Sequence, residues 1–371
     1  MQIAILGAGM VGRTIATDLA PQHTVTSFDI SSQSLELLAQ KNNSIKCIQA
    51  DLSDFKKYAA LLKDVDYVIS AVPGFMGYKT LEAIIQAGKN VVDISFFPED
   101  ALQLDRLAKE KNVTAVVDCG VAPGMSNLIL GYHNAKMQIS SFECMVGGLP
   151  KTRIKPFEYK APFSPIDVLE EYTRPARYVE NGHIVTKPAL SDPELVDFAK
   201  AGTLESFNTD GLRSILYTMP HIPNMKEKTL RYPGHISLVQ SLIKAGFLNR
   251  QPVQFKGLQV SPLEFTSAIL FNQWKLGSTE AEFTLMTIEI KGEGKTIRYE
   301  LYDEYDAATQ TSSMSRTTGY TATAALHLLI NKLFTQPGVF PPELVGSNEA
   351  CFGFMMQYLE QRKIAYHKTE W

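Results

Sequence analysis

Short apolar runs alternate with helical stretches through the first third of this 371-residue chain. The pattern predicts strands over residues 2–6, 24–30, 45–50, 67–72, 91–95 and 114–118, separated by helices over residues 13–20, 33–41, 55–62, 79–87 and 99–111. Runs such as AIL, YVISAV and TAVVD are apolar at almost every position, which is typical of strands covered on both faces. Parallel strands need crossovers of about this length, so the pattern predicts a doubly wound parallel sheet.

The glycine motif GAGMVG directly follows the first predicted strand and opens the first helix. Gly7 permits a tight turn, Gly9 lets the backbone approach a diphosphate, and Gly12 lets the helix pack closely on the strand. The amides of Met10 and Val11 lie at the helix N-terminus, where free N–H groups and the positive end of the dipole favour phosphate. The motif therefore predicts a dinucleotide-binding Rossmann domain.

An acidic residue, Asp29, ends the second predicted strand, where its carboxylate can accept hydrogen bonds from both ribose hydroxyls. This carboxylate would repel a 2′-phosphate, and residues 30–32 add no basic side chain, so NAD is favoured over NADP. Asp51 follows the third strand and is predicted to contact adenine, with a helix N-cap as an equally good interpretation. Three residues at the end of the fourth strand are predicted to line the inner ribose: Ala71, Val72 and Pro73.

The composition is that of an ordinary soluble protein, with 45% hydrophobic and 20% charged residues and a net charge of −3. Basic residues are scattered and nearly matched by acidic ones, which argues against a nucleic-acid partner. The four cysteines form no CxxC pair and have no histidine at zinc-ligand spacing, so we expect neither disulfides nor a metal site. No basic leader and no apolar run of membrane-spanning length is present, so we expect a cytoplasmic protein with no membrane partner.

The alternating pattern ends near residue 120, where a glycine- and proline-containing turn precedes a predicted helix over residues 126–135. Later, the segments 282–290 and 296–302 alternate as strands of a hairpin. We therefore predict a Rossmann domain over residues 1–120 and an α+β domain with a mixed sheet over residues 121–310. A long helix at about 316–335 is predicted to return to the first domain.

Several motifs along the chain resemble those of the saccharopine dehydrogenase-like family. They are GAGMVG with Asp29, DCGVAPGM at 118–125, VGGLP at 146–150, TLRYPGH at 229–235, SRTTGYTA and GVFPPE. Within the family, VAPGM and VGGxP resemble the lysine 6-dehydrogenase branch more than the saccharopine reductases. The reductases carry an aspartate before PG and a cysteine before GG, where this chain has Ala122 and Val146.

This resemblance implies a dimeric NAD enzyme that oxidises the terminal amine of lysine, or of a similar amino acid, to an imine that water then hydrolyses. The second domain would bind the substrate and form the dimer. Two alternatives stay open. One is a condensing reductase of the saccharopine or carboxynorspermidine type, and the other is a sensor that binds NAD(H) without turnover.

Oxidation of an amine needs a base for the ammonium proton and an anchor for the amino acid. Asp93 and Asp118 end strands five and six at the edge where open sheets bind ligands, although helix capping or loop anchoring would also explain them. His235 could accept a proton near neutral pH, with a structural role as the alternative. Arg231 could hold the substrate carboxylate with two parallel hydrogen bonds, unless it is a surface residue.

Four further residues are predicted to line the substrate pocket only because they fall in segments that resemble the family's: Met125, Tyr159, Thr209 and Asp210.

Overall fold

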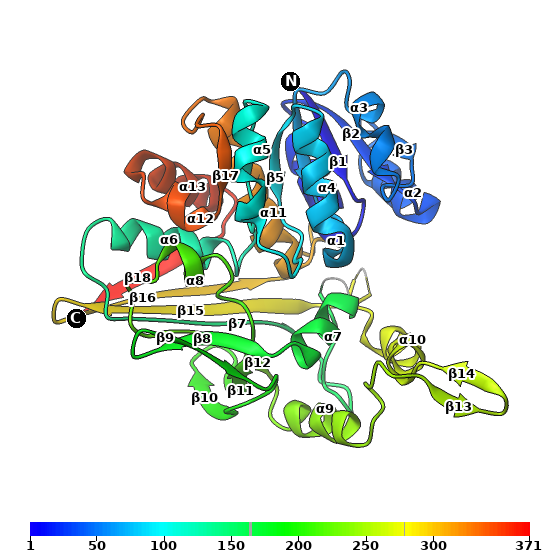
Figure 1. Ribbon diagram of the computed structural model, residues 1–371, viewed down its shortest axis with the longest axis vertical. Helices are drawn as coiled ribbons and strands as arrows, with labels where there is room; N and C mark the ends of the chain where they lie inside the picture. Colours follow the sequence, from blue (N-terminus) through cyan, green and yellow to red (C-terminus); the bar gives the residue numbers. More distant parts are fainter. Residues whose placement is uncertain (163–164, 278) are drawn as a thin grey trace.

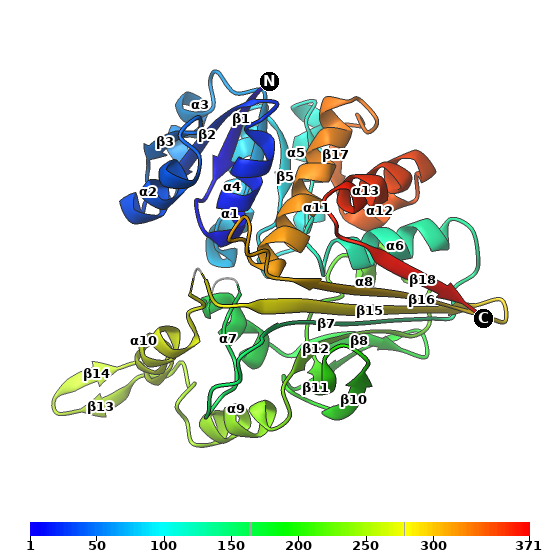
Figure 2. The ribbon, with the colours of Figure 1, turned by 180° about the vertical axis from the view of Figure 1, so that it is seen from behind.

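The structure, a computed structural model, describes residues 1–162, 165–277 and 279–371, and two large sheets organise it (Figures 1 and 2). The first sheet is parallel, with the strand order β17-β6-β5-β4-β1-β2-β3. Its strands are β1 (Gln2–Leu6), β2 (Thr24–Asp29), β3 (Lys46–Gln49), β4 (Tyr67–Ser70), β5 (Asn90–Asp93), β6 (Thr114–Val116) and β17 (Gly338–Phe340). We call this sheet and the helices that cover it the first domain.

Helices cover both faces of this sheet, as the near-continuous apolar strands require. Along β1, Ile3 and Ile5 pack into one buried cluster while Ala4 and Leu6 pack into another on the opposite face. The helices and 3-10 helices of this domain are α1 (Met10–Leu19), α2 (Ser32–Lys41), η1 (Phe55–Lys57), α3 (Tyr58–Leu61), α4 (Gly74–Gln86), η2 (Ala101–Leu104), α5 (Asp105–Glu110), α11 (Ser313–Ile330), α12 (Pro342–Gly346) and α13 (Glu349–Gln361). Helix α6 (Met125–Asn134) lies between α12 and the second sheet (Figure 1).

Two details of the first domain differ from the prediction. Helix α4 begins at Gly74, directly after Pro73, rather than at residue 79. Proline is compatible with a helix start because the first amides have no partner within the helix. The sheet also has a seventh strand, β17, which pairs in parallel with β6. This strand has only three residues, too few for a periodic pattern.

The second sheet is mixed and has nine strands, with the main order β10-β11-β12-β7-β15-β16-β18. Its strands are β7 (Ser141–Pro150), β8 (Ala176–Glu180), β9 (His183–Lys187), β10 (Glu194–Phe198), β11 (Gly202–Asn208), β12 (Met225–Arg231), β15 (Glu282–Gly292), β16 (Lys295–Glu304) and β18 (Tyr366–Glu370). β12 pairs in parallel with β7, and β15 pairs antiparallel with both β7 and β16. The predicted fold class and the hairpin of β15 and β16 are confirmed.

Shorter elements surround the second sheet: α7 (Pro165–Thr173), α8 (Ile215–Thr218), α9 (His235–Lys244), α10 (Pro262–Trp274), β13 (Val253–Phe255) and β14 (Leu258–Val260). In Figure 1, β13 and β14 form an arm that projects from the body beyond α10. We call this sheet and these elements the second domain. β18 also belongs to this domain, although it lies beyond the predicted limit at residue 310. The sequence did not predict this strand, because its exposed, polar residues show no strand pattern.

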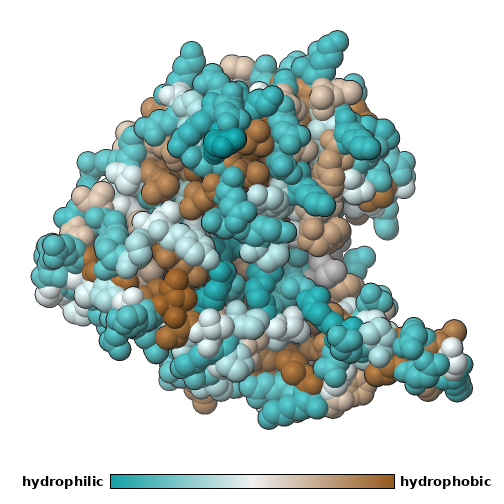
Figure 3. All heavy atoms as spheres, in the orientation of Figure 1, coloured by the Kyte–Doolittle hydropathy of each residue, from teal (hydrophilic) through white to brown (hydrophobic). Residues whose placement is uncertain are grey.

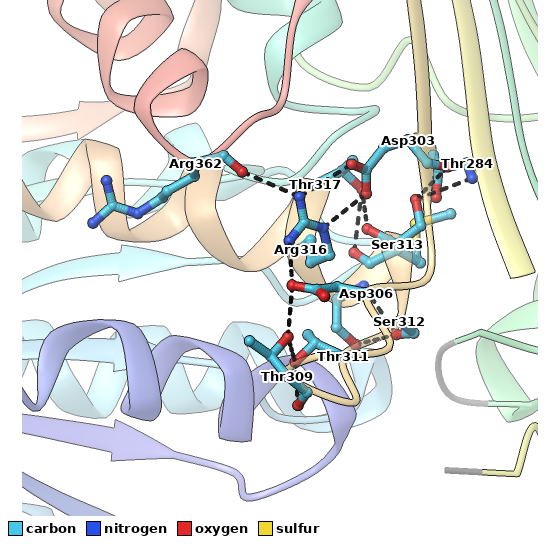
Figure 4. Close-up of polar contacts among 12 residues, drawn as sticks. Thr284, Asp303, Asp306, Thr309, Thr311, Ser312, Ser313, Arg316, Thr317 and Arg362 are labelled. Atoms are coloured by element: carbon cyan, nitrogen blue, oxygen red, sulfur yellow. Dashed lines mark hydrogen bonds and ion pairs between the residues drawn. The ribbon is translucent and has the colours of Figure 1, made fainter. Parts of the chain in front are cut away.

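Helix α11 joins the two domains, rising from the second sheet to the first and packing against α1 (Figure 2). Its first turn is fixed to β15 and β16. The Arg316 guanidinium lies 3.1 Å from the Asp303 carboxylate and 3.3 Å from that of Asp306 (Figure 4). The buried Glu282 carboxyl accepts the amide N–H of Ser313, and burial raises the pKa of Glu282 to about 8.

Candidate functional site

A cavity of about 1400 Å³ lies between the two domains, beside the residues that follow β1, β4 and β5. Open parallel sheets bind ligands at this edge, because the loops that leave adjacent strands diverge there. Figure 3 shows that the outline of the molecule is indented between the first domain and the β13–β14 arm. Typical small-molecule sites enclose roughly 300–1000 Å³, so this cavity has room for two ligands side by side.

The glycine turn forms one wall of the cavity and fits a dinucleotide. Gly7 has φ of 105°, and a Cβ there would lie 2.5 Å from the Ala71 carbonyl oxygen. A Cβ at Gly12 would collide with the carbonyl oxygen of Gly7. A Cβ at Gly9 would meet no atom within 4 Å, and no side chain caps the helix that begins after it. The backbone at Gly9 is therefore open to a diphosphate, with helix amides free to bind it.

All ten residues predicted to bind the cofactor line this cavity. The Asp29 carboxylate accepts the amide N–H of Ala8 at 2.6 Å and that of Ser31 at 2.8 Å, which fixes it at the rim. The Asp51 carboxylate accepts hydrogen bonds from the hydroxyl and the amide of Ser53, and these bonds lower the pKa of Asp51.

Arg13 was missed by the sequence reasoning, which found no basic residue near Asp29. Its guanidinium lines the cavity, donates to the Ala8 carbonyl at 2.8 Å and is close enough to Asp29 for the two charges to interact. The sequence could have indicated Arg13, because this residue directly follows Gly12 and so lies in the first turns of the helix that the glycine motif opens. The ribose end of the cavity therefore contains charges of both signs.

The two aspartates predicted as bases lie in different surroundings. Asp118 lines the cavity and forms an ion pair with Arg213, with 2.8 Å between Oδ1 and Nε. Asp93 is buried outside the cavity lining, where its carboxylate accepts hydrogen bonds from the amide and hydroxyl of Ser95. Burial raises the pKa of Asp93 to about 7. Of the two, only Asp118 reaches the space that a substrate would occupy.

Arg231 lies at the end of β12, lines the cavity and is 2% exposed. It is therefore no surface arginine. Its Nε donates to the Tyr172 hydroxyl at 2.8 Å, and its Nη2 lies 3.1 Å from the Glu171 carboxylate. The guanidinium stacks over the Tyr159 ring at 4.4 Å from the ring centre. These contacts hold the guanidinium in one orientation and leave further N–H groups for a ligand carboxylate.

Besides Asp93, three predicted residues do not line the cavity. His235 is buried behind Arg231, with Nε2 2.9 Å from the Tyr172 hydroxyl and Nδ1 2.9 Å from the Phe157 carbonyl oxygen. Burial, with the nearby Arg231 charge, lowers the pKa of His235 to about 3, so it stays neutral and supports the arginine's neighbours. Tyr159 lies under Arg231, and Met125 packs in the apolar core.

Thr209 and Asp210 both line the cavity, on the loop after β11. The Asp210 carboxylate is held by the Arg177 guanidinium, at 2.8 Å and 2.9 Å. Thr209 donates its hydroxyl to the Glu227 carboxyl, which also lines the cavity.

Sequence reasoning missed several charged residues on the substrate side of the cavity: Lys160, Arg174, Glu227 and Lys275. Arg174 stands over the Phe96 ring at 5.2 Å and lies 3.8 Å from the Glu170 carboxylate. Glu227 could have been found from the sequence, because it alternates with Thr229 and Arg231 on a strand and so shares their face. Arg174 could not have been found in this way, since it follows helix α7, whose sequence contains none of the family motifs.

Among the residues that the structure describes, no group of three His, Cys, Asp or Glu side chains could hold a metal ion. Nor does any helix in those parts of the chain combine the length and apolarity needed to cross a membrane.

These features define a two-domain protein in which a dinucleotide-binding fold is closed by a mixed sheet. The family model described as the saccharopine dehydrogenase NADP binding domain matches residues 3–116, and the one described as the saccharopine dehydrogenase C-terminal domain matches residues 120–364. The chain belongs to the saccharopine dehydrogenase family. The predicted family is thus confirmed, and the lysine 6-dehydrogenase branch stays a prediction.

Relatives in this family carry several names. The chain is 26% identical to the saccharopine dehydrogenase [NADP(+), L-glutamate-forming] of Pyricularia oryzae over 68% of its own length and 59% of the relative's. It is 24% identical to the mitochondrial alpha-aminoadipic semialdehyde synthase of Bos taurus, over 67% of this chain but only 28% of that protein. It is also 22% identical to the carboxyaminopropylagmatine dehydrogenase of Synechocystis, over 92% of each chain.

One solved structure has the same fold over the full length. The apo histidine-tagged saccharopine dehydrogenase (L-Glu forming) from Saccharomyces cerevisiae superposes with a TM-score of 0.80, at 19% identity, covering 100% of this chain and 99% of that one. The likeness shows that the arrangement of the two sheets is shared with this enzyme.

Proposed function

We propose that this protein is a dehydrogenase that binds NAD in the first domain and oxidises the carbon–nitrogen bond of a small amino acid, as lysine 6-dehydrogenases do. The observation that carries the proposal is the shared cavity. It brings the glycine turn and Asp29 of one domain together with the buried, preoriented Arg231 of the other. When bound, oxidised nicotinamide accepts a hydride from the carbon that carries the nitrogen.

The residues of the chain bind, orient and shield the reactants. Helix α1 and the turn at Gly9 hold the diphosphate, while Asp29 accepts the ribose hydroxyls. Arg231, fixed by Glu171 and Tyr172, holds the α-carboxylate of the amino acid. The two domains enclose the dinucleotide and the amino acid, so that water is displaced and the reacting groups are held in one relative orientation.

NAD is proposed over NADP because the Asp29 carboxylate would repel a 2′-phosphate. Arg13 offers a positive charge at the same rim, which lessens that repulsion without removing the carboxylate. We therefore expect a preference for NAD with some activity on NADP.

The direct test follows the absorbance of the reduced nicotinamide when the purified protein receives NAD with lysine, ornithine or other diamino acids. We expect turnover with at least one diamino acid. Absence of turnover across this panel, with protein that binds NAD, would contradict the proposal.

A condensing reductase is the second candidate function, and two observations favour it. The similarity to carboxyaminopropylagmatine dehydrogenase extends over nearly both whole chains. Arg174, Lys160 and Lys275 also line the cavity, and such cations suit a substrate with more than one carboxylate. An assay with reduced dinucleotide, an amine and a keto acid or aldehyde, followed by mass analysis of the product, separates the two functions.

We also propose that the protein forms a homodimer through the β13–β14 arm. An isolated two-stranded hairpin is at best marginally stable in water, and this arm exposes Phe255 and Leu258, with Phe265 of α10 beside it. A second copy would cover this apolar surface. Sedimentation analysis should find a dimer for the unaltered chain and a monomer for Phe255→Lys, and a monomeric unaltered chain contradicts the proposal.

A further inference from the structure

Glu227 is a buried carboxyl side chain on β12 that faces the cavity. Thr209 donates its hydroxyl to this carboxyl, and the Thr209 and Thr229 hydroxyl oxygens lie 3.0 Å apart. Gly211 makes the position possible, because a Cβ there would collide with the Glu227 carboxyl group. The Glu227 carboxyl group, which extends from β12, is therefore held against Gly211 in the cavity between the two domains.

Five other carboxylates that line the substrate half of the cavity each form an ion pair with a basic side chain. These pairs are Asp118 with Arg213, Glu170 with Arg250, Glu171 with Arg231, Asp210 with Arg177 and Glu280 with Lys160. Glu227 differs, because its hydrogen-bond partners are neutral and no lysine, arginine or histidine of the described residues lies within ion-pair distance of it. Its carboxyl group is thus left for a cation that the protein does not supply.

The position of Glu227 relative to Arg231 suits an amino acid with a charged group at each end. Side chains at alternate positions of a strand share one face, so Glu227, Thr229 and Arg231 all point into the cavity. At about 3.3 Å per residue, the Cα atoms of Glu227 and Arg231 are roughly 13 Å apart. Because both side chains line the same cavity, this separation leaves room for an aliphatic chain of several carbons between their charged groups.

The surroundings of Glu227 favour its protonated form when no cation is bound. Burial, together with the nearby carboxylates of Glu171 and Asp210, raises the pKa of Glu227 to about 8, although hydrogen bonds from Thr209 and the Gly211 backbone oppose the rise. The buried thiol of Cys144 lies on the neighbouring strand β7 and adds no positive charge. An ammonium group placed beside Glu227 would favour the ionised form instead.

We propose that the Glu227 carboxyl group receives the side-chain ammonium of the substrate and takes the proton that this nitrogen must lose before its carbon is oxidised. The assignment rests on the proposed amine oxidation. The ammonium N–H bond breaks and its proton goes to the Glu227 carboxylate. The carbon then loses a hydride to oxidised NAD, and the nitrogen lone pair forms the C=N bond of a protonated imine. Atoms and charge balance, with NAD as the two-electron oxidant.

The proposal predicts a proton release on binding that does not depend on turnover. Near pH 7 the free protein carries a proton on Glu227, and free lysine carries one on its side-chain amine. In the complex, the Glu227 carboxyl and the lysine amine together keep only one of these two protons, and the other is released to the solvent. Binding of L-lysine should therefore release close to one proton at pH 7, and little at pH 9.5, where Glu227 is already ionised.

Calorimetry of the full chain loaded with NADH, in two buffers of different ionisation enthalpy, measures this proton release. L-norleucine is the matched ligand, because it has the same carbon chain without the terminal amine, and it should release no proton. Glu227→Gln should abolish the release with L-lysine. Glu282→Gln is the matched protein control, since Glu282 is also buried with a pKa raised to about 8 but lies outside the cavity.

The outcomes separate this proposal from the proposed function. Failure of the unaltered protein to bind L-lysine, binding without proton release, or release that persists in Glu227→Gln each overturns the role of Glu227. Proton-linked binding with no NAD reduction supports that role and contradicts amine oxidation. The pH 9.5 measurement needs no variant, so the test holds even if Glu227→Gln does not fold. In an active enzyme, Glu227→Gln should also flatten the pH profile of kcat between pH 7 and 9.

Discussion

The two ends of the cavity are built in opposite ways. At the cofactor end, the wall comes from the segments that follow β1, β2, β3 and β4, and the glycine turn after β1 offers backbone groups rather than side chains. At the substrate end, the wall combines side chains from α7, β12, the loop after β11 and the loop after β6. The first design depends on glycine and backbone geometry, whereas the second depends on which charges meet. Substitutions at the two ends should therefore affect different quantities, namely the affinity for the cofactor at one end and kcat/KM for the amino acid at the other.

The largest effect is expected from Arg231→Ala at the substrate end. Truncating one partner of a buried, hydrogen-bonded charge pair costs about 3–4 kcal/mol, so kcat/KM for the amino acid should fall roughly 100- to 1000-fold. Affinity for NAD, measured by calorimetry, should stay unchanged because Arg231 belongs to the other domain. An equal loss of both affinities would contradict the division of the cavity into two ends.

Gly9→Ala tests the cofactor end. A Cβ at Gly9 meets no protein atom within 4 Å, so the melting temperature should stay the same, but the added methyl fills space needed by the diphosphate. Overpacking costs about 1–3 kcal/mol, which predicts a 10- to 100-fold weaker Kd for NAD. Gly353→Ala is the matched control, since Gly353 in α13 is also open and far from the cavity. Unaltered NAD binding by Gly9→Ala would remove the glycine turn from the site.

Asp29→Ser should change the choice of cofactor rather than the chemistry. Loss of a charged acceptor costs about 1.5–2 kcal/mol, so NAD should bind roughly 10- to 30-fold more weakly while NADP, freed from repulsion and near Arg13, should bind more tightly. Arg13→Ala should have the reverse effect on NADP. The ratio of kcat/KM values for the two cofactors measures both variants, and an unchanged ratio in Asp29→Ser would show that this carboxylate does not select the cofactor.

The smallest effect concerns Glu282, which lies outside the cavity where α11 meets the second sheet. Its folded-state pKa of about 8 lies above the ordinary value of 4.5, so the folded state favours the proton and stability is lost as the pH rises from 4.5 through 8. Each such group contributes at most about 1.4 kcal/mol per pH unit to this slope. Glu282→Gln should reduce the slope in urea unfolding, whereas Glu300→Gln, at an exposed site, should leave it unchanged.

The contrast between the two ends also explains how far the sequence could be interpreted. The parallel sheet, the glycine turn and Asp29 were predictable because each depends on residues close together in the chain, with a periodicity or a spacing that reveals them. β17 and β18 were not, since three residues and an exposed polar run carry no pattern until their partners are known. The surroundings of two predicted bases could not be foreseen for the same reason, whereas the third, Asp118, does line the cavity. Burial and partners decide the role of His235 and Asp93, and both depend on contacts distant in sequence.

The strand order of the first sheet has a consequence for how the protein is made. β17 pairs with β6, although all of the second domain except β18 separates Val116 from Gly338 in the chain. While the ribosome synthesises that domain, the edge of β6 has no neighbour and could pair with another nascent chain. The N-terminal sheet is completed only after the segment behind it has emerged. Chaperone dependence during translation should therefore concentrate on this interval.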